Sequence, residues 1–227
     1  MKNIVVIGTV VLALVAGGAW WYTSSGETPQ NTEISGVATE TGFESSGDAE
    51  IDTSGIVEMT LGEDDAPVTL IEYASFTCPH CASFHINQFK QLKSDFIDTG
   101  VVKFIHRDVY FDRYGLWASM VARCAGPGRF FGITDMIYEQ QRDWLASRDP
   151  VQIADELRRI GKVAGLSEDQ LEACLSDAEK AEALVAVYQQ NAEADDVSST
   201  PTLIINGDKH QNMAYAELKG IIEGLIN

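Results

Sequence analysis

The chain has 227 residues, 45% of them hydrophobic, and a formal net charge of −18 at pH 7. This hydrophobic fraction supports a folded core and excludes a disordered chain. The excess of acidic side chains argues against general binding to nucleic acid or anionic lipid. The length suits one domain with a targeting segment.

The N-terminal segment has the pattern of a membrane-directed sequence. Residues 3–22 carry no charge and read NIVVIGTVVLALVAGGAWWY. About 20 apolar residues are enough to span a bilayer, and aromatic rings such as Trp20 and Trp21 favour the membrane–water boundary. Small residues at 17–19, after a shorter apolar run, fit a cleaved secretory signal instead. We expect residues 1–22 to be either a signal anchor or a signal peptide, with Lys2 inside and the rest of the chain across the membrane.

Residues 23–54 form a second zone, rich in Ser, Thr, Gly and Glu and without a hydrophobic period. This composition predicts a flexible acidic and polar linker. We expect the folded domain to occupy residues 55–227.

The first half of that domain alternates predicted strands with a helix. Residues 68–76 (VTLIEYASF) form an apolar, β-branched run that predicts a buried strand. Residues 79–96 carry aromatic and aliphatic side chains near helical spacing. Residues 101–109 (VVKFIHRDV) predict a second strand.

Residues from about 113 to 195 have a helical pattern. Asp149 before Pro150 is a helix-start signal, and Ser167 with Gln170 has the spacing of a capping box. A strand at 202–206 and a helix at 214–226 complete the domain. Strands that alternate with helices indicate an α/β fold, and the helical block is too long for a simple crossover. We expect it to be an insertion that lies over the sheet.

The motif Cys78-Pro79-His80-Cys81 lies where the first strand gives way to the first helix. Unpaired N–H groups and the helix dipole at that position favour a thiolate and lower the thiol pKa. We expect Cys78 to be the exposed attacking sulfur and Cys81 the more buried resolving sulfur. His80 is expected to stabilise the Cys78 thiolate further. Such stabilisation favours the reduced pair, so the disulfide should be a good oxidant.

Two other uses of these cysteines remain open. The motif is half of a zinc-type ligand set, and His85 lies four residues after Cys81 on the same predicted helix face. Other ligands would come from Cys124, Cys174 or the remaining histidines, without a second CxxC or an HxxxH motif. A structural disulfide is the other alternative, although so short a loop stabilises a fold little. We expect no metal and no cofactor.

Cys-Pro-His-Cys at a strand-to-helix junction resembles the active site of the DsbA family of bacterial periplasmic dithiol oxidases. The resemblance covers roughly residues 57–227 and implies a thioredoxin-like fold with an inserted helical domain. It implies that Glu72 is the family's buried acid, which relays the proton of Cys81. Thr200 and Pro201 match the family's cis-proline loop, whose backbone pairs with an extended substrate.

The same resemblance implies a function and partners. It predicts a periplasmic thiol:disulfide oxidoreductase that donates disulfides to reduced exported proteins. A DsbB-like, quinone-linked membrane oxidase would reoxidise it. Thr200 departs from the valine often found there in DsbA-type oxidases and matches DsbC-type isomerases, so a disulfide isomerase or reductase is the alternative. A metal-binding or chaperone module that uses the same cysteines is an alternative of another class.

The remaining cysteines and histidines are expected to be structural. Cys124 and Cys174 both fall on apolar faces of the helical block, and we predict a disulfide between them. Its loop of about 50 positions is worth roughly 4 kcal/mol on the chain-entropy model. Two buried free cysteines are the alternative. His106, in the second predicted strand, and His210, after the Asn206–Gly207 turn, are expected to be surface or hydrogen-bonded core residues.

Overall fold

The computed structural model describes residues 51–226 of the chain. The predicted signal or anchor at 1–22, and the predicted linker except for residues 51–54, therefore lie outside the described residues. In the described range, no helix combines the length and the apolar character needed to cross a membrane.

A five-stranded mixed sheet forms the centre of the domain, in the order β1-β3-β2-β4-β5. β2 (Val68–Ala74) runs parallel to β3 (Val102–Asp108), and β1 (Met59–Leu61) pairs antiparallel with β3. β4 (Thr202–Ile205) and β5 (Asp208–Gln211) extend the other side antiparallel. The three strands predicted from apolar runs are confirmed. β1 was not predicted, because three residues carry too little of an alternating pattern.

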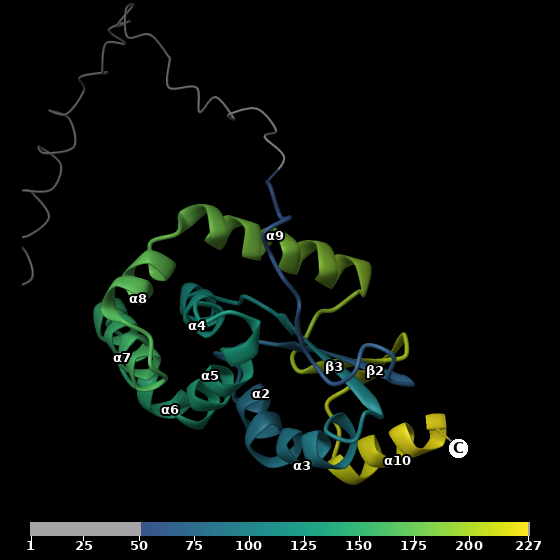
Figure 1. Ribbon diagram of the computed structural model, residues 1–227. Coiled ribbons are helices and arrows are strands. Elements are labelled where there is room, and N and C mark those ends of the chain that lie inside the picture. The colour runs from purple at the N-terminus through teal and green to yellow at the C-terminus, as the bar shows by residue number, and fades with distance from the viewer. Residues whose placement is uncertain (1–50, 227) are drawn as a thin grey trace, which may run out of the picture. The chain divides into compact units, whose positions relative to one another are not determined.

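Helices cover both faces of the sheet (Figure 1). A continuous helical segment follows β2 and alternates between α and π geometry: α2 (Pro79–Phe84), η1 (His85–Phe89), α3 (Lys90–Leu92) and η2 (Lys93–Ile97). This segment and α10 (Tyr215–Ile226) lie on one face, and α9 lies on the other. The active-site motif is therefore at the start of a helix that packs on the central strand.

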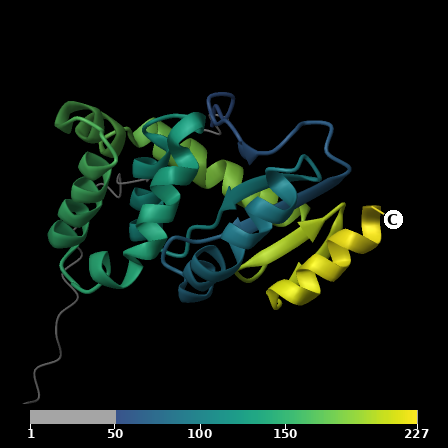
Figure 2. The same ribbon diagram turned by 60° about the horizontal axis from the view of Figure 1, so that its bottom comes forward.

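Six helices lie between β3 and β4: α4 (Arg113–Arg123), α5 (Pro127–Glu139), α6 (Gln141–Trp144), α7 (Pro150–Val163), α8 (Glu168–Leu175) and α9 (Ala178–Ala194). The predicted helix start at Asp149 is confirmed, since its side chain accepts from the N–H of Val151, and Ser167 and Gln170 form the predicted capping box. Helices α4 to α8 gather beside one end of the sheet, and α9 alone runs along its face (Figure 2). The block therefore does not lie over the sheet as a whole, contrary to the expectation.

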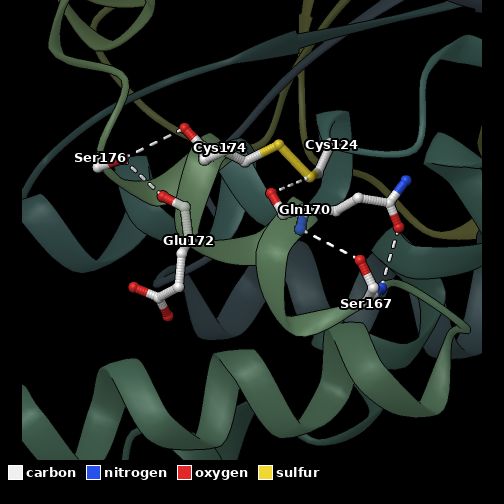
Figure 3. Close-up of a disulfide and its surroundings, with 7 residues drawn as sticks. Cys124, Ser167, Gln170, Glu172, Cys174 and Ser176 are labelled. Carbon is white, nitrogen blue, oxygen red and sulfur yellow. Dashed lines mark hydrogen bonds between the residues drawn. A yellow bond between two sulfur atoms is a disulfide. The ribbon is translucent and has the colours of Figure 1, made fainter.

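A disulfide joins Cys124, at the C-terminal end of α4, to Cys174 of α8 (Figure 3). Its Cα atoms are 5.8 Å apart and 50 positions separate the two residues. Both cysteines are only partly buried, and Cys124 Sγ lies 3.3 Å from the carbonyl oxygen of Gln170. The sulfurs therefore tie two helices near the surface, rather than deep in the core as their apolar faces predicted.

Candidate active site

Cys78 and Cys81 occupy two different environments at the start of α2. Cys78 is the N-cap residue, with an extended backbone and Pro79 directly after it. Cys78 is only 8% exposed, so the expectation of an exposed sulfur is wrong, but it remains the more accessible of the two because Cys81 is completely buried. Both sulfurs are unbonded, so the structure represents the reduced pair. A protein thiol that approaches the site therefore meets Cys78 first.

The surroundings of Cys78 favour its thiolate. A hydrogen bond from the Cys81 thiol is the largest cause, and it outweighs burial to lower the pKa of Cys78 to about 5. The Thr200 side chain and the backbone N–H groups of Cys81 and His80 add to this effect. Burial raises the pKa of Cys81. At neutral pH, Cys78 is an anion and Cys81 a neutral thiol.

The imidazole of His80 is exposed, and it makes no hydrogen bond or ion pair with another described residue. His80 acts on Cys78 through its backbone N–H, which any residue would supply. The predicted contribution of its side chain therefore stays a prediction.

Thr200 and Pro201 lie beside the cysteine pair. Their peptide bond is cis, as the resemblance implied. The Cys78 sulfur lies 3.5 Å from the carbonyl oxygen of Thr200, to which it donates a hydrogen bond when it is protonated. This contact joins the start of α2 to the loop before β4, two segments far apart in the sequence.

Two further contacts, which the sequence did not predict, hold the loop that carries Cys78. The Nε2 group of Gln141, a buried residue of α6, donates to the carbonyls of Phe76 and Cys78 at 2.8 and 2.9 Å. The hydroxyl of Thr77 donates to Asp112, the N-cap residue of α4, at 2.9 Å. The inserted helices thus fix the backbone around the attacking sulfur.

Glu72 is completely buried in β2, and two histidines surround it. Its Oε2 accepts a hydrogen bond from His85 Nε2 at 2.8 Å and lies 3.6 Å from His106 Nδ1. Burial alone would raise the pKa of Glu72, but the two imidazoles hold it well below its usual range. Glu72 is therefore ionised at neutral pH, which is unusual for a carboxyl group without solvent contact.

The charged network continues beyond His106. His106 Nε2 lies 3.4 Å from Asp108 Oδ1, and Arg123 donates to Asp108 at 2.7 Å. Burial opposes a charge on His106, yet the two carboxylates raise its pKa to about 9. Glu72 and Asp108 thus face protonated His106, and Asp108 also pairs with Arg123, so each buried carboxylate has a cationic neighbour. His106 is buried in the core, but neither ring nitrogen has a hydrogen-bond partner, so the expected hydrogen-bonded core histidine is wrong in that respect, and the sequence did not reveal the carboxylates that face it.

One ligand-type atom from each of Glu72, His85 and His106 lies within 4.8 Å of the other two. Two imidazoles and a carboxylate are donors that transition metals accept. We assign ion pairs here instead, because each carboxylate already has a cationic neighbour and His85 Nε2 is engaged by Glu72. Within residues 51–226, neither Cys78 nor Cys81 belongs to a cluster with metal-ligand spacing. The zinc-type alternative for the cysteines thus finds no support in the geometry.

Comparison with known proteins identifies the family. A model of the thioredoxin family, described as "Thioredoxin", matches residues 54–224. The chain belongs to the thioredoxin family. A protein-disulfide oxidoreductase of Rickettsia bellii is 32% identical over 170 residues, which are 74% of this chain and 64% of that protein. Disulfide bond formation protein D of Bacillus subtilis is 31% identical over 73% of this chain and 76% of its own length.

Solved structures identify the branch of the family. The crystal structure of alpha-DsbA1 from Wolbachia pipientis superposes with a TM-score of 0.69 and 26% identity, over 74% of this chain and 90% of that one. The crystal structure of oxidised BdbD from Bacillus subtilis superposes with a TM-score of 0.66 and 26% identity, over 74% of this chain and 92% of that one. The thioredoxin-like fold with a helical insertion and the DsbA-type relationship, both expected from the sequence, are confirmed. The chain spans 64% of the length of the Rickettsia bellii relative.

Proposed function

We propose that this protein is a thiol:disulfide oxidoreductase that donates disulfides to exported proteins through a Cys78–Cys81 cycle. The observation that carries the proposal is the environment of Cys78. Its sulfur lies at a helix N-terminus, receives several hydrogen bonds, and has a pKa lowered to about 5. A pair whose thiolate is so favoured is stable when reduced, so its disulfide accepts electrons readily.

The cycle starts from the oxidised pair. A substrate thiolate attacks Cys78, the Cys78–Cys81 bond breaks, and Cys81 leaves with the electron pair and takes up a proton. The second substrate thiolate then attacks its partner sulfur in the mixed disulfide and releases Cys78 as a thiolate. The substrate loses two electrons and the cysteine pair gains them.

The other site residues have proposed roles around these sulfurs. Pro79 is the first residue of α2, directly after Cys78, and His80 stabilises the Cys78 thiolate. Thr200 and Pro201 bind the substrate backbone next to Cys78, a role supported by the 3.5 Å contact between the Cys78 thiol and the carbonyl of Thr200. Glu72 relays the proton of Cys81. The Coulombic interaction between the two groups supports this role.

Cysteine variants test the cycle. Cys78→Ser should abolish oxidation of a reduced dithiol peptide, because the Cys78–Cys81 disulfide that the substrate thiolate attacks can no longer form. With oxidised glutathione as the oxidant, Cys81→Ser should accumulate mixed disulfides between Cys78 and a substrate cysteine, because no second thiol of the pair is left to resolve them. Failure of the Cys81 variant to capture any thiol partner under oxidising conditions would exclude this mechanism. The double change of Cys124 and Cys174 to serine is the matched control, since it removes the other two cysteines together and leaves no unpaired thiol outside the Cys78–Cys81 pair.

Disulfide isomerisation or reduction is the second candidate, and Thr200 favours it. Thr200 supplies a side-chain hydrogen bond to Cys78, and threonine at this position is the feature shared with DsbC-type isomerases. The redox state of the pair in cells separates the two functions, because a donor rests oxidised and an isomerase rests reduced. We expect the oxidised state.

The proposed location is the bacterial periplasm, with the protein either anchored by residues 3–22 or released after cleavage. The partner proposed for reoxidation is a quinone-linked membrane oxidase of the DsbB type. The support is the DsbA-type relationship and the apolar run at the N-terminus. Fractionation of cells, followed by detection of the protein in membrane and soluble periplasmic fractions, distinguishes an anchor from a cleaved signal.

A further inference from the structure

The proposed cycle leaves a problem of proton supply at Cys81. When the disulfide is attacked, Cys81 leaves as a thiolate at a position with no exposed surface. Until that thiolate is protonated, it is a good nucleophile that can attack the mixed disulfide and reverse the step. Rapid delivery of a proton to Cys81 therefore commits the reaction to go forward.

Glu72 alone is a poor source of this proton. Its carboxylate is held ionised by the imidazoles around it, so at neutral pH it has no proton of its own to give. It can nevertheless accept a proton on one side and release it on the other. The proton itself has to come from a neighbouring group that is protonated at neutral pH.

Two buried histidines lie where such a group is needed. His85 is four residues after Cys81 on the same helical segment, so the two side chains lie about one helical turn apart. His85 donates to Glu72, and His106 approaches the same carboxylate oxygen from β3. His85 and His106 are each 1% exposed. The route from Cys81 through Glu72 to His106 thus runs entirely inside the protein.

His106 lacks the hydrogen bonds that a buried histidine usually makes. Each of its ring nitrogens faces a carboxylate oxygen at 3.4–3.6 Å, beyond an ordinary hydrogen bond. Eight buried side-chain atoms lack a hydrogen-bond partner in the described part of the chain, and five belong to Glu72, His85, His106 and Asp108. Buried polar groups are nearly always paired. In a purely structural network we expect ordinary hydrogen-bond distances at these nitrogens, whereas a histidine that passes a proton needs both ring nitrogens available.

His106 also reaches a small cavity on the far side of the network. The cavity has a volume of about 30 Å³ and is lined by His106, Asp108 and Arg123 together with residues of α9 such as Tyr188. A space of this size holds a water molecule. Cys78 and Thr200 do not line it, so a proton that enters here does not pass through the substrate site.

We propose that Glu72 and His106, assisted by His85, form a proton path between the Cys81 sulfur and this cavity, with His106 as the group that holds the proton. The inference rests on the proposed dithiol–disulfide cycle. His106 touches neither sulfur and acts through Glu72, so it is a positioning residue. In the forward step, the proton of His106 moves through Glu72 to Cys81, and His106 regains a proton at the cavity.

Several groups set the charge around His106, and a test of pH dependence has to consider all of them. They are Glu72 from β2, Asp108 from β3, Arg123 from α4, His85 from η1, Tyr138 and Asp135 from α5, Cys81 from α2, Tyr110 after β3, and Glu58 and Arg107 at the cavity.

His106→Gln tests the path, because glutamine keeps hydrogen-bonding groups but does not titrate. The measurement is the single-turnover rate at which excess dithiothreitol reduces the oxidised pair, corrected for the thiolate fraction of the reductant. In the natural chain, this rate should fall above about pH 9, where His106 loses its proton. In the variant, the rate near neutral pH should be about 100-fold lower, the lower end of what positioned proton transfer contributes, and the inflection should be absent.

His210→Gln is the matched control, since it removes a histidine on β5 outside the network. It should behave like the natural chain. A His106→Gln profile that superposes on the natural one would overturn the proton path. If this variant does not fold, the path is tested on the natural chain alone, by measuring its reduction rate in water and in deuterium oxide. The path is supported if the natural chain is reduced more slowly in deuterium oxide than in water and its reduction rate declines above about pH 9. It is refuted if the rates in water and deuterium oxide are equal and the rate does not change with pH.

The test separates this inference from the proposed function. If the natural oxidised protein does not oxidise a dithiol peptide, the proposed function fails. If it does, and loss of His106 leaves the profile unchanged, the proton path alone fails.

Discussion

Replacement of Thr200 by valine should make the protein a weaker oxidant. Valine matches the shape of threonine but removes the side-chain hydrogen bond to Cys78. The backbone carbonyl of Thr200, which lies 3.5 Å from the Cys78 sulfur, is retained. The variant therefore isolates one donor to the thiolate.

The size of the effect follows from the pKa of Cys78. Lowering this pKa from 9.0 to about 5 favours the reduced form at pH 7 by about 2.7 kcal/mol, or about 60 mV for two electrons. A hydrogen bond to a charged group is worth at least about 1.5 kcal/mol. Its loss should raise the Cys78 pKa by about one pH unit and lower the potential at pH 7 by about 30 mV.

The difference between Thr200→Val and the natural chain should depend on pH in a defined direction. Because the pKa of Cys78 is depressed in the folded protein, the advantage of the thiolate exists above about pH 5 and is lost as pH falls through that value. At about pH 4 both proteins carry a neutral Cys78 thiol, so their potentials should nearly coincide.

Two measurements check this reasoning: titration of the Cys78 thiolate by its ultraviolet absorbance, and equilibration of the pair with glutathione. Thr202→Val is the matched control, because the Thr202 hydroxyl donates to the carbonyl of Ser199 and not to a sulfur. An unchanged Cys78 pKa in Thr200→Val, or an equal effect of the control, would refute the assignment of Thr200 as a thiolate donor.

Three further variants test the surroundings of the site. His80→Ala should raise the Cys78 pKa; since alanine keeps the backbone N–H, any rise in the thiolate titration measures the imidazole alone, and no rise removes that side chain from the mechanism. Gln141→Ala should leave the carbonyls of Phe76 and Cys78 without their buried donor, at a cost of about 1–3 kcal/mol each in the free energy of unfolding; denaturant titration against exposed Gln152→Ala as control checks this. The double change of Cys124 and Cys174 to serine should lower the free energy of unfolding by about 4 kcal/mol and leave the Cys78 pKa unchanged; a shifted pKa would mean that the disulfide acts on the site.

Local patterns were sufficient to predict the junction that carries the chemistry. A β-branched run followed by Cys78-Pro79 already implies a strand that ends where a helix begins, because both signals lie within a few adjacent residues. The cap at Asp149 and the capping box at Ser167 are local for the same reason. Prediction succeeded where the interacting groups are neighbours in the chain.

The proton network depends on contacts between distant segments, which local sequence patterns do not predict. Glu72 and His106 are direct neighbours only because β2 and β3 are parallel and paired in one register, and an apolar run does not specify register. Helical spacing places His85 on the same face as Cys81, but it does not specify which strand residue that face meets, so the contact with Glu72 was not predicted. Gln141 lies in a four-residue helix, too short to show a period.

The two sulfurs obtain their properties from different parts of the fold, and this separation can be tested. The donors to Cys78 come from the start of α2 and from Thr200, and they determine how stable the thiolate is. The groups near Cys81 come from β2, β3 and η1, and in our proposal they determine how fast its proton moves. Loss of Thr200's hydroxyl should therefore lower the potential without a new dependence of the rate on pH. Loss of His106 should slow reduction and leave the Cys78 pKa in place. If either variant changed both properties together, the two sulfurs would have to be treated as one coupled unit.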